Sequence, residues 1–243
     1  MFFFVDLRII YCFMKNIFSA FLIMFIFSCS KKQPYLEYQK KAINLRNNIT
    51  VFNNRNETIS FDFGMWMFNE RKLEVDAIAN WIGIKQKGKS ILEPINIIWV
   101  DYKANTKNEA RENITTFLNA NDFLIRNGSS VGYYGLFENN NWIPQYKETW
   151  SDKEDPKTIN NHGRIFPAHK ITSNLNNPVF VSTGAFSIED ELHYLVSFNE
   201  ALKKMKETKE WKVFRNRFKA ANIIQEHNYT TFDHEGIIVF VLN

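Results

Sequence analysis

Two histidines and one arginine lie within eleven residues of the sequence, in the stretch NNHGRIFPAHK at 160–170. Successive side chains of a β-strand point to opposite faces, so His162 and Arg164 share one face if this stretch is a strand. Histidine can act as a base or a ligand, and arginine can hold a carboxylate or phosphate through two hydrogen bonds. Together with His193, these two residues are candidates for a small anion site.

A simpler interpretation is that these side chains only satisfy structural hydrogen bonds, because most buried polar groups do so. The separation between His162 and His169 matches no standard metal site, and no His-Glu-x-x-His, phosphate loop or Gly-x-Ser-x-Gly motif is present. We therefore predict no metal and no cofactor, assign no catalytic residue, and favour a role other than an enzyme.

The N-terminal region has the pattern of a secretion signal. An uncharged apolar stretch runs from Ile17 to Phe27, and it is shorter than the roughly twenty residues that a membrane-spanning helix needs. Ile26, Phe27, Ser28 and Cys29 resemble the lipobox of bacterial lipoproteins. That resemblance implies a lipidated Cys29 that carries acyl chains such as palmitate. A signal peptide cut elsewhere and an uncleaved anchor are the alternatives.

We expect translation to start at Met14, because Met14-Lys15-Asn16 is the compact positive region that a signal needs. The predicted parts are a signal peptide at 1–28, a lipidated N-terminus and tether at 29–45, and one domain at 46–243. Without Cys12 and with Cys29 acylated, the domain has no free thiol, which excludes a disulfide or a thiolate nucleophile.

Composition indicates a folded domain, since 45% of the residues are hydrophobic and 23% are charged. The net charge of +4 is far below the strongly basic balance that is typical of nucleic-acid binding. We therefore expect no nucleic-acid partner.

The spacing of apolar residues predicts a mixture of helices and strands. Residues 69–82 have the pattern of an amphipathic helix, residues 95–100 that of a buried strand, and Thr106 with Glu109 forms a capping box that opens a second helix. A hairpin is expected at 139–141 and a polar loop at 146–161.

The last third of the chain continues this mixture. Strands are expected at 177–187, 191–198 and 236–241, and Ser197 with Glu200 forms another capping box. Because helices and strands do not alternate strictly, we predict an α+β fold, with a single mixed or antiparallel sheet covered by helices on one face.

The order of these segments resembles the LssY C-terminal domain family over about residues 91–210. The residues that carry the resemblance are His162, Arg164 and Ile165 in a first motif, Gly184, Ala185 and Ser187 in a second, and His193 in a third. Flanking residues and the loop at 146–161 depart from the family pattern. The resemblance implies a fold and not an activity, because the family has no assigned reaction.

A basic run between Lys203 and Lys219 is interleaved with aromatic residues. We predict it to be a helix, and on a tethered protein such a helix would lie on anionic lipid head groups. The candidate residues are Lys203, Lys204, Lys206, Lys212, Arg215 and Lys219. The alternative is a solvated helix face above a core-facing aromatic stripe.

The sequence thus predicts a lipid-anchored protein of the bacterial cell envelope, held on the non-cytoplasmic side of a membrane. Its role is expected to be binding or structural, with anionic lipid or an envelope protein as partner. The alternative is a hydrolase of an anionic or phosphorylated envelope substrate that uses His162, Arg164 and His193. A hydrolase requires these three side chains to converge on an open cleft, whereas a binding protein does not.

Overall fold

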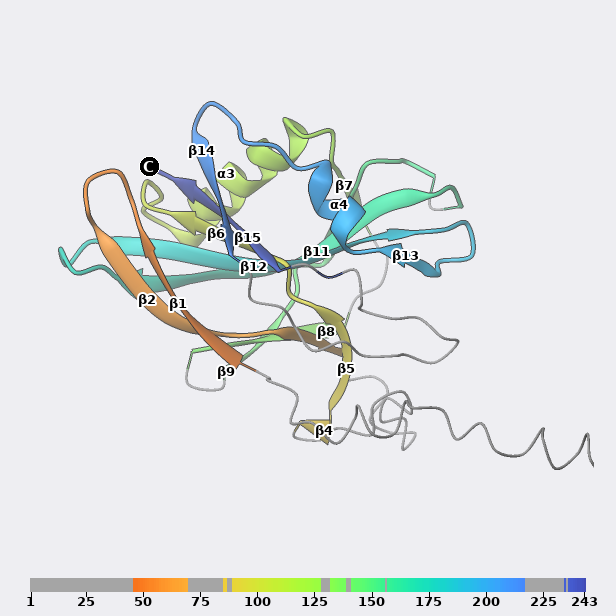
Figure 1. Cartoon of the computed structure of the whole chain (residues 1–243), viewed down its shortest axis with the longest axis horizontal. Helices are drawn as coiled ribbons and strands as arrows, with labels where there is room; N and C mark the ends of the chain where they lie inside the picture. Colours follow the sequence, from red (N-terminus) through yellow and green to blue (C-terminus); the bar gives the residue numbers. More distant parts are fainter. Residues whose placement is uncertain are drawn as a thin grey trace, which may run out of the picture. The chain divides into compact units, whose positions relative to one another are not determined.

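A computed structural model describes residues 46–69, 85–86, 89–127, 132–138, 141–155, 157–216, 234 and 236–243, which lie in one compact unit, Ile43–Asn243. These ranges contain fifteen strands and two helices (Figure 1). Neither of the described helices is long and apolar enough to cross a membrane. Cys29, Lys219 and residues 70–82 of the predicted first helix lie outside the described residues.

The first sheet is antiparallel and contains seven strands in the order β1-β2-β8-β3-β5-β4, with β9 beside β8. Its strands are β1 (Arg46–Phe52), β2 (Thr58–Gly64), β3 (Trp66–Asn69), β4 (Lys85–Gln86), β5 (Lys89–Pro94), β8 (Tyr133–Phe137) and β9 (Asn141–Pro144).

The second sheet contains eight strands in the order β14-β15-β6-β12-β11-β10-β7, with β13 beside β12. Its strands are β6 (Ile97–Asp101), β7 (Leu124–Asn127), β10 (Glu148–Ser151), β11 (Asn160–Thr172), β12 (Pro178–Glu189), β13 (Leu195–Ser197), β14 (Trp211–Asn216) and β15 (Ile237–Leu242). Among the strands that the structure describes, only the β6–β15 pair is parallel. The helices are α3 (Lys107–Asn119) and α4 (Asn199–Lys203).

Strand β15 is buried on both faces, which explains its continuous apolar sequence IIVFVL. Ile237, Val239 and Val241 point into a core shared with the first sheet. Ile238 and Phe240 point the other way, into a core shared with α3. The second sheet is therefore a middle layer, with the first sheet on one face and the helices on the other.

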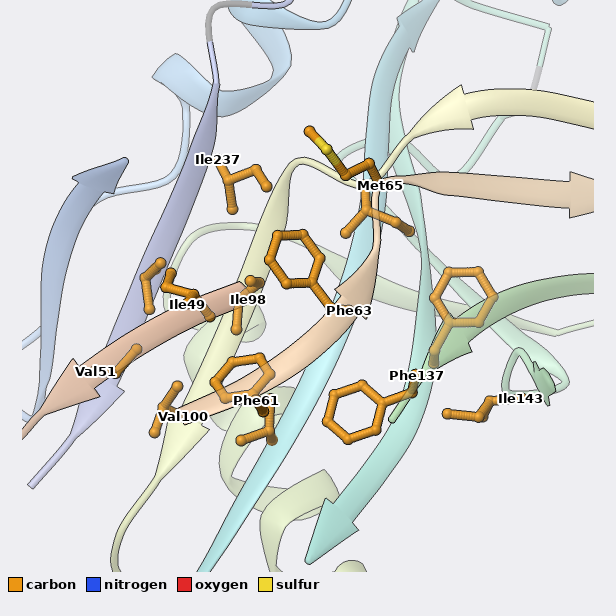
Figure 2. Packing of buried hydrophobic residues seen from close by; sticks show 14 of the residues in the cluster. Ile49, Val51, Phe61, Phe63, Met65, Ile98, Val100, Phe137, Ile143 and Ile237 are labelled. Carbon is orange, nitrogen blue, oxygen red and sulfur yellow. The ribbon is translucent and has the colours of Figure 1, made fainter. Parts of the chain in front are cut away.

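The core between the sheets is made by strands of alternating character. In β1 and β2, Ile49, Val51, Phe61 and Phe63 are buried while their neighbours face outward. Figure 2 shows these side chains beside Ile98, Val100 and Ile237 of the second sheet. Because residues two apart share a face, this alternation is what allows β1 and β2 to cover the second sheet and face solvent on their other side.

The predicted α+β fold, a single sheet covered by helices, is wrong. The described residues are mostly β-strand, and a second sheet covers the other face of the central strands. The helix layer on one face was expected, and α3 supplies it through Ile114 and Phe117. The period-two pattern of β1 and β2 is the sequence signal that the single-sheet prediction left out.

Several local predictions are confirmed. Thr106 caps α3 by accepting a hydrogen bond from the Glu109 backbone N–H at 3.1 Å, and β8 and β9 form the expected hairpin. Ser197 likewise accepts from the backbone N–H of Glu200 at 2.9 Å. The predicted polar loop at 146–161 is wrong in part, because β10 lies within it and pairs with β7 and β11.

The predicted basic helix is also wrong. Helix α4 ends at Lys203, and the chain enters β14 at Trp211. Trp211 and Val213 alternate into the helix-side core as β14 pairs with β15, so tertiary pairing overrides the charge pattern. Three of the lysines are also paired with acids: Lys203 with Glu200, Lys204 with Asp152, and Lys212 with Glu207. They do not form one free cationic face.

Gly163 permits the close approach of β11 to the ring of Phe186 on β12. A Cβ atom at Gly163 would lie 2.3 Å from that ring, which is buried. We expect Gly163→Ala to lower the free energy of unfolding by about 1–3 kcal/mol, because overpacking forces the ring from its position. Chemical denaturation measures the change. Thr172→Ala, at an exposed position of the same strand, is the control, and an equal effect of both substitutions would contradict the packing argument.

Candidate functional site

The inner face of the second sheet becomes polar at one end of β11 and β12. In the paired register, His162 lies opposite Ser187 and Arg164 opposite Ala185, so these side chains share the face that is directed at the first sheet. We use the name polar cluster for Glu93, His162, Arg164, Ser187, Glu189 and His193.

Arg164 joins the two sheets. Its Nη1 donates to Oε1 of Glu93 on β5 at 3.4 Å, and its guanidinium carbon lies 4.3 Å from the centre of the Tyr133 ring on β8. Only 4% of Arg164 is exposed. The Ser187 hydroxyl donates to the other oxygen of Glu93 at 3.5 Å. Glu93 therefore has contacts with both β11 and β12.

Glu189 contacts two histidines. One carboxyl oxygen lies 3.3 Å from His162 Nε2, and the other lies 3.5 Å from His193 Nδ1. His193 follows β12 in a tight turn and has a left-handed backbone φ of 63°. The turn is closed by a hydrogen bond from the His193 backbone N–H to the Asp190 carbonyl at 3.0 Å, and it directs the His193 side chain back to Glu189.

Burial favours the uncharged forms of Glu189 and His162. The pKa of Glu189 is raised to about 8, mainly by burial and also by the neighbouring Glu93, while Arg164 acts in the opposite direction. Burial lowers the pKa of His162 to about 3, with Arg164, Arg126 and His193 acting in the same direction. At neutral pH both shifts favour an uncharged contact between Glu189 and His162 over a salt bridge.

The three predicted site residues do converge, since His162 and His193 both contact Glu189, and Arg164 contacts Glu93. They differ sharply in access, because 57% of the His193 side chain is exposed while His162 is buried. Among the described residues, no three His, Cys, Asp or Glu side chains are placed to hold a metal ion. The cluster offers hydrogen bonds and one ion pair between the sheets.

Two members of the cluster were missed by the sequence reasoning. Glu189 is on the same strand face as Ser187, two residues away, so the strand period could have identified it. Nothing local in the sequence places Glu93 near Arg164, because they are brought together only by the packing of two sheets. His169 is separate from the cluster, and its ring stacks on Phe137 with 4.6 Å between centroids.

The two pKa shifts predict how stability depends on pH. A pKa of Glu189 raised from 4.5 to about 8 removes stability as the pH rises through that interval. A pKa of His162 lowered from 6.5 to about 3 adds stability as the pH rises from 3 to 6.5. The two effects offset each other between pH 4.5 and 6.5, and above 6.5 only the loss from Glu189 remains.

We therefore expect Glu189→Gln to reduce the loss of stability between pH 6.5 and 8 by up to about 2 kcal/mol, because an amide cannot ionise. Denaturant titrations of both proteins at the two pH values measure this difference. Equal losses in the two proteins would show that Glu189 is already ionised at pH 6.5.

Comparison of the chain with protein-family models, with curated proteins and with solved structures found no match. The resemblance to the LssY C-terminal domain family therefore stays a prediction, and the proposals below depend on the geometry and the sequence of this chain.

Proposed function

We propose that this chain is a lipid-anchored protein of the bacterial envelope, with a binding or structural role. The signal pattern that ends in Cys29 supports the anchor. The observation that supports a non-catalytic role is the inward pairing of the polar cluster, in which Arg164 and His162 are buried and bonded to glutamates.

This pairing fits a structural link between the two sheets better than a reactive site. We call this link, formed by the polar cluster, the latch. The Arg164–Glu93 contact joins β11 to β5 and so connects the two sheets. A buried polar group without its partner costs about 1–3 kcal/mol, so the cluster stabilises the native state mainly through the contacts of Arg164 and His162 with Glu93 and Glu189. The cluster contributes one exposed ring, that of His193, to the surface at this end.

If the cluster is structural, Arg164→Ala and His162→Ala should each lower the free energy of unfolding by about 1–3 kcal/mol, because Glu93 or Glu189 loses its buried partner. His193→Ala is the matched control, since its exposed ring should contribute less than about 0.5 kcal/mol. Thermal and denaturant unfolding of the three variants provide the measurement. Unchanged unfolding of the Arg164 and His162 variants would refute the latch.

The convergence of His162, Arg164 and His193 is a specific observation in favour of the hydrolase alternative. Arg164 Nε and His162 Nδ1 are also buried without a hydrogen-bond partner among the described residues, so they are the donors that an anion bound within the cluster would use. A screen with phosphorylated and carboxylated substrates tests this function. Activity that disappears in His193→Ala, while its unfolding is unchanged, would replace the latch with a hydrolase.

The anchor has its own test. We expect Cys29→Ser to abolish incorporation of radiolabelled fatty acid in a bacterial host and to release the protein from the membrane fraction, because the thioether-linked lipid cannot form. Ser30→Ala, next to the lipidation position, is the control and should leave labelling unchanged. Continued labelling of the Cys29 variant would show that the lipid is attached elsewhere.

A further inference from the structure

Three loops at one end of the two sheets are joined by hydrogen bonds. They are the β1–β2 turn at 53–57, the β6–α3 loop at 102–106 and the β11–β12 turn at 173–177, and we call them the loop end (Figure 1). The Tyr102 hydroxyl donates to the carbonyls of Val51 at 3.1 Å and Glu57 at 3.3 Å. Asn174 and Thr58 exchange two more bonds, so the three loops hold one another in place.

Glu57, the one carboxylate within these loops, is buried. It accepts hydrogen bonds from the Ser173 hydroxyl at 2.5 Å and the Asn53 amide at 3.0 Å. The bond from Ser173 is the main cause of a lowered pKa of Glu57, and bonds from Asn177 and Asn53 act in the same direction. The carboxylate is thus used inside the loop end and is not part of its outer surface.

The outer surface of the loop end is cationic. Arg55 and Lys103 are exposed on two of the loops, and Lys107 and Lys170 are exposed just beyond them. Two carboxylates that flank the β6–α3 loop are also engaged: Asp101 is buried and bonded to Asn113, and Glu109 accepts from the Asn105 backbone N–H. The positive charge of this end is therefore not balanced by exposed acids of the loops.

Large apolar side chains are exposed at the same end. Phe52 is 58% exposed, Leu175 54% and Phe214 41%. The rings of Phe52 and Phe214 contact each other, with 6.2 Å between centroids, although they belong to different sheets. Leu175 follows Asn174, which bonds to Thr58, the cross-strand partner of Phe52. Two hairpins and strand β14 thus present apolar side chains beside the cations.

We propose that the loop end docks on an anionic lipid surface, with Phe52, Leu175 and Phe214 entering the head-group region and Arg55, Lys103, Lys107 and Lys170 contacting the anionic heads. Apolar side chains beside unbalanced cations are the combination that binds anionic bilayers. The proposal rests on the proposed anchor for its biological setting, because the anchor keeps the domain near a membrane. It assigns the lipid contact to the loop end and the adjoining Phe214 of β14, and not to the lysines of the predicted basic helix.

The strand β12 offers a matched control within the same fold. Leu175 lies in the turn before β12, and Leu192 lies in the turn after it. Both side chains are exposed and apolar, but they are at opposite ends of a strand of twelve residues. A probe at Leu192 therefore experiences the same vesicles without belonging to the loop end.

The experiment uses the lipidated protein in vesicles, with Leu175→Cys or Leu192→Cys carrying a thiol-linked, environment-sensitive dye. Vesicles of phosphatidylcholine are compared with vesicles that also contain phosphatidylglycerol. We expect a blue shift of the Leu175→Cys dye in the anionic vesicles only, its loss at high salt because screening shortens the interaction, and no shift of the Leu192→Cys dye. Adding Lys103→Glu and Lys170→Glu should abolish the shift.

Equal shifts at both dye positions, an equal shift in neutral vesicles, or no shift in anionic vesicles would each overturn the proposed docking. The number of dye molecules bound per chain tests the anchor separately. An acylated Cys29 has no free thiol, so only the introduced cysteine reacts and one dye binds per chain. Two dyes per chain would contradict the anchor alone. With vesicles in excess, the shift at Leu175→Cys is still measured in that case.

Discussion

The burial of β6 and β15 on both faces is the constraint on which the rest of the structure depends. Their parallel pairing places apolar residues on the two sides of one sheet, so each side must be covered. Asn96 fixes the neighbouring backbone, since its amide donates to the Phe186 carbonyl at 2.8 Å and accepts from the Phe186 N–H at 3.0 Å. One face then receives α3, and the other receives the first sheet.

This arrangement also explains the polar cluster. Where β11 and β12 extend past the apolar core between the sheets, their inner side chains are still shielded from water, so any charge there must be paired or neutralised. Arg164 is paired with Glu93, and Glu189 and His162 lose their charges together. Neutralisation makes the stability of the contact between β11 and β12 depend on pH, as an entirely apolar contact would not.

Local features of the fold were predictable, and the arrangement of the layers was not. The cap at Thr106, the strand at β6 and the hairpin between β8 and β9 depend on residues close in sequence, and each was predicted. The second sheet was not, because nothing local indicates that β1 and β2 cover β6 and β15. The prediction of a basic helix failed for the same reason. Part of this run forms β14, and its pairing with β15 depends on a strand that is distant in the sequence.

The candidate site shows the same division. His162, Arg164 and His193 were identified by residue type, yet their environment is decided by glutamates that arrive from β5 and β12. Sequence alone could not show that burial would favour a neutral histidine and a protonated glutamate, because burial is a property of the packed sheets.

The two ends of β12 therefore differ in how they use carboxylates. At the cluster end, Glu93 and Glu189 lie between the sheets and neutralise or bond the basic groups there. At the loop end, Glu57 is turned inward to serve the backbone turns, which leaves Arg55 and Lys103 exposed without an exposed carboxylate in the same loops. A net charge of +4 over the whole chain is too small to indicate such a surface. The local positive charge arises because folding buries the acid and exposes the bases, so it is visible only in the structure.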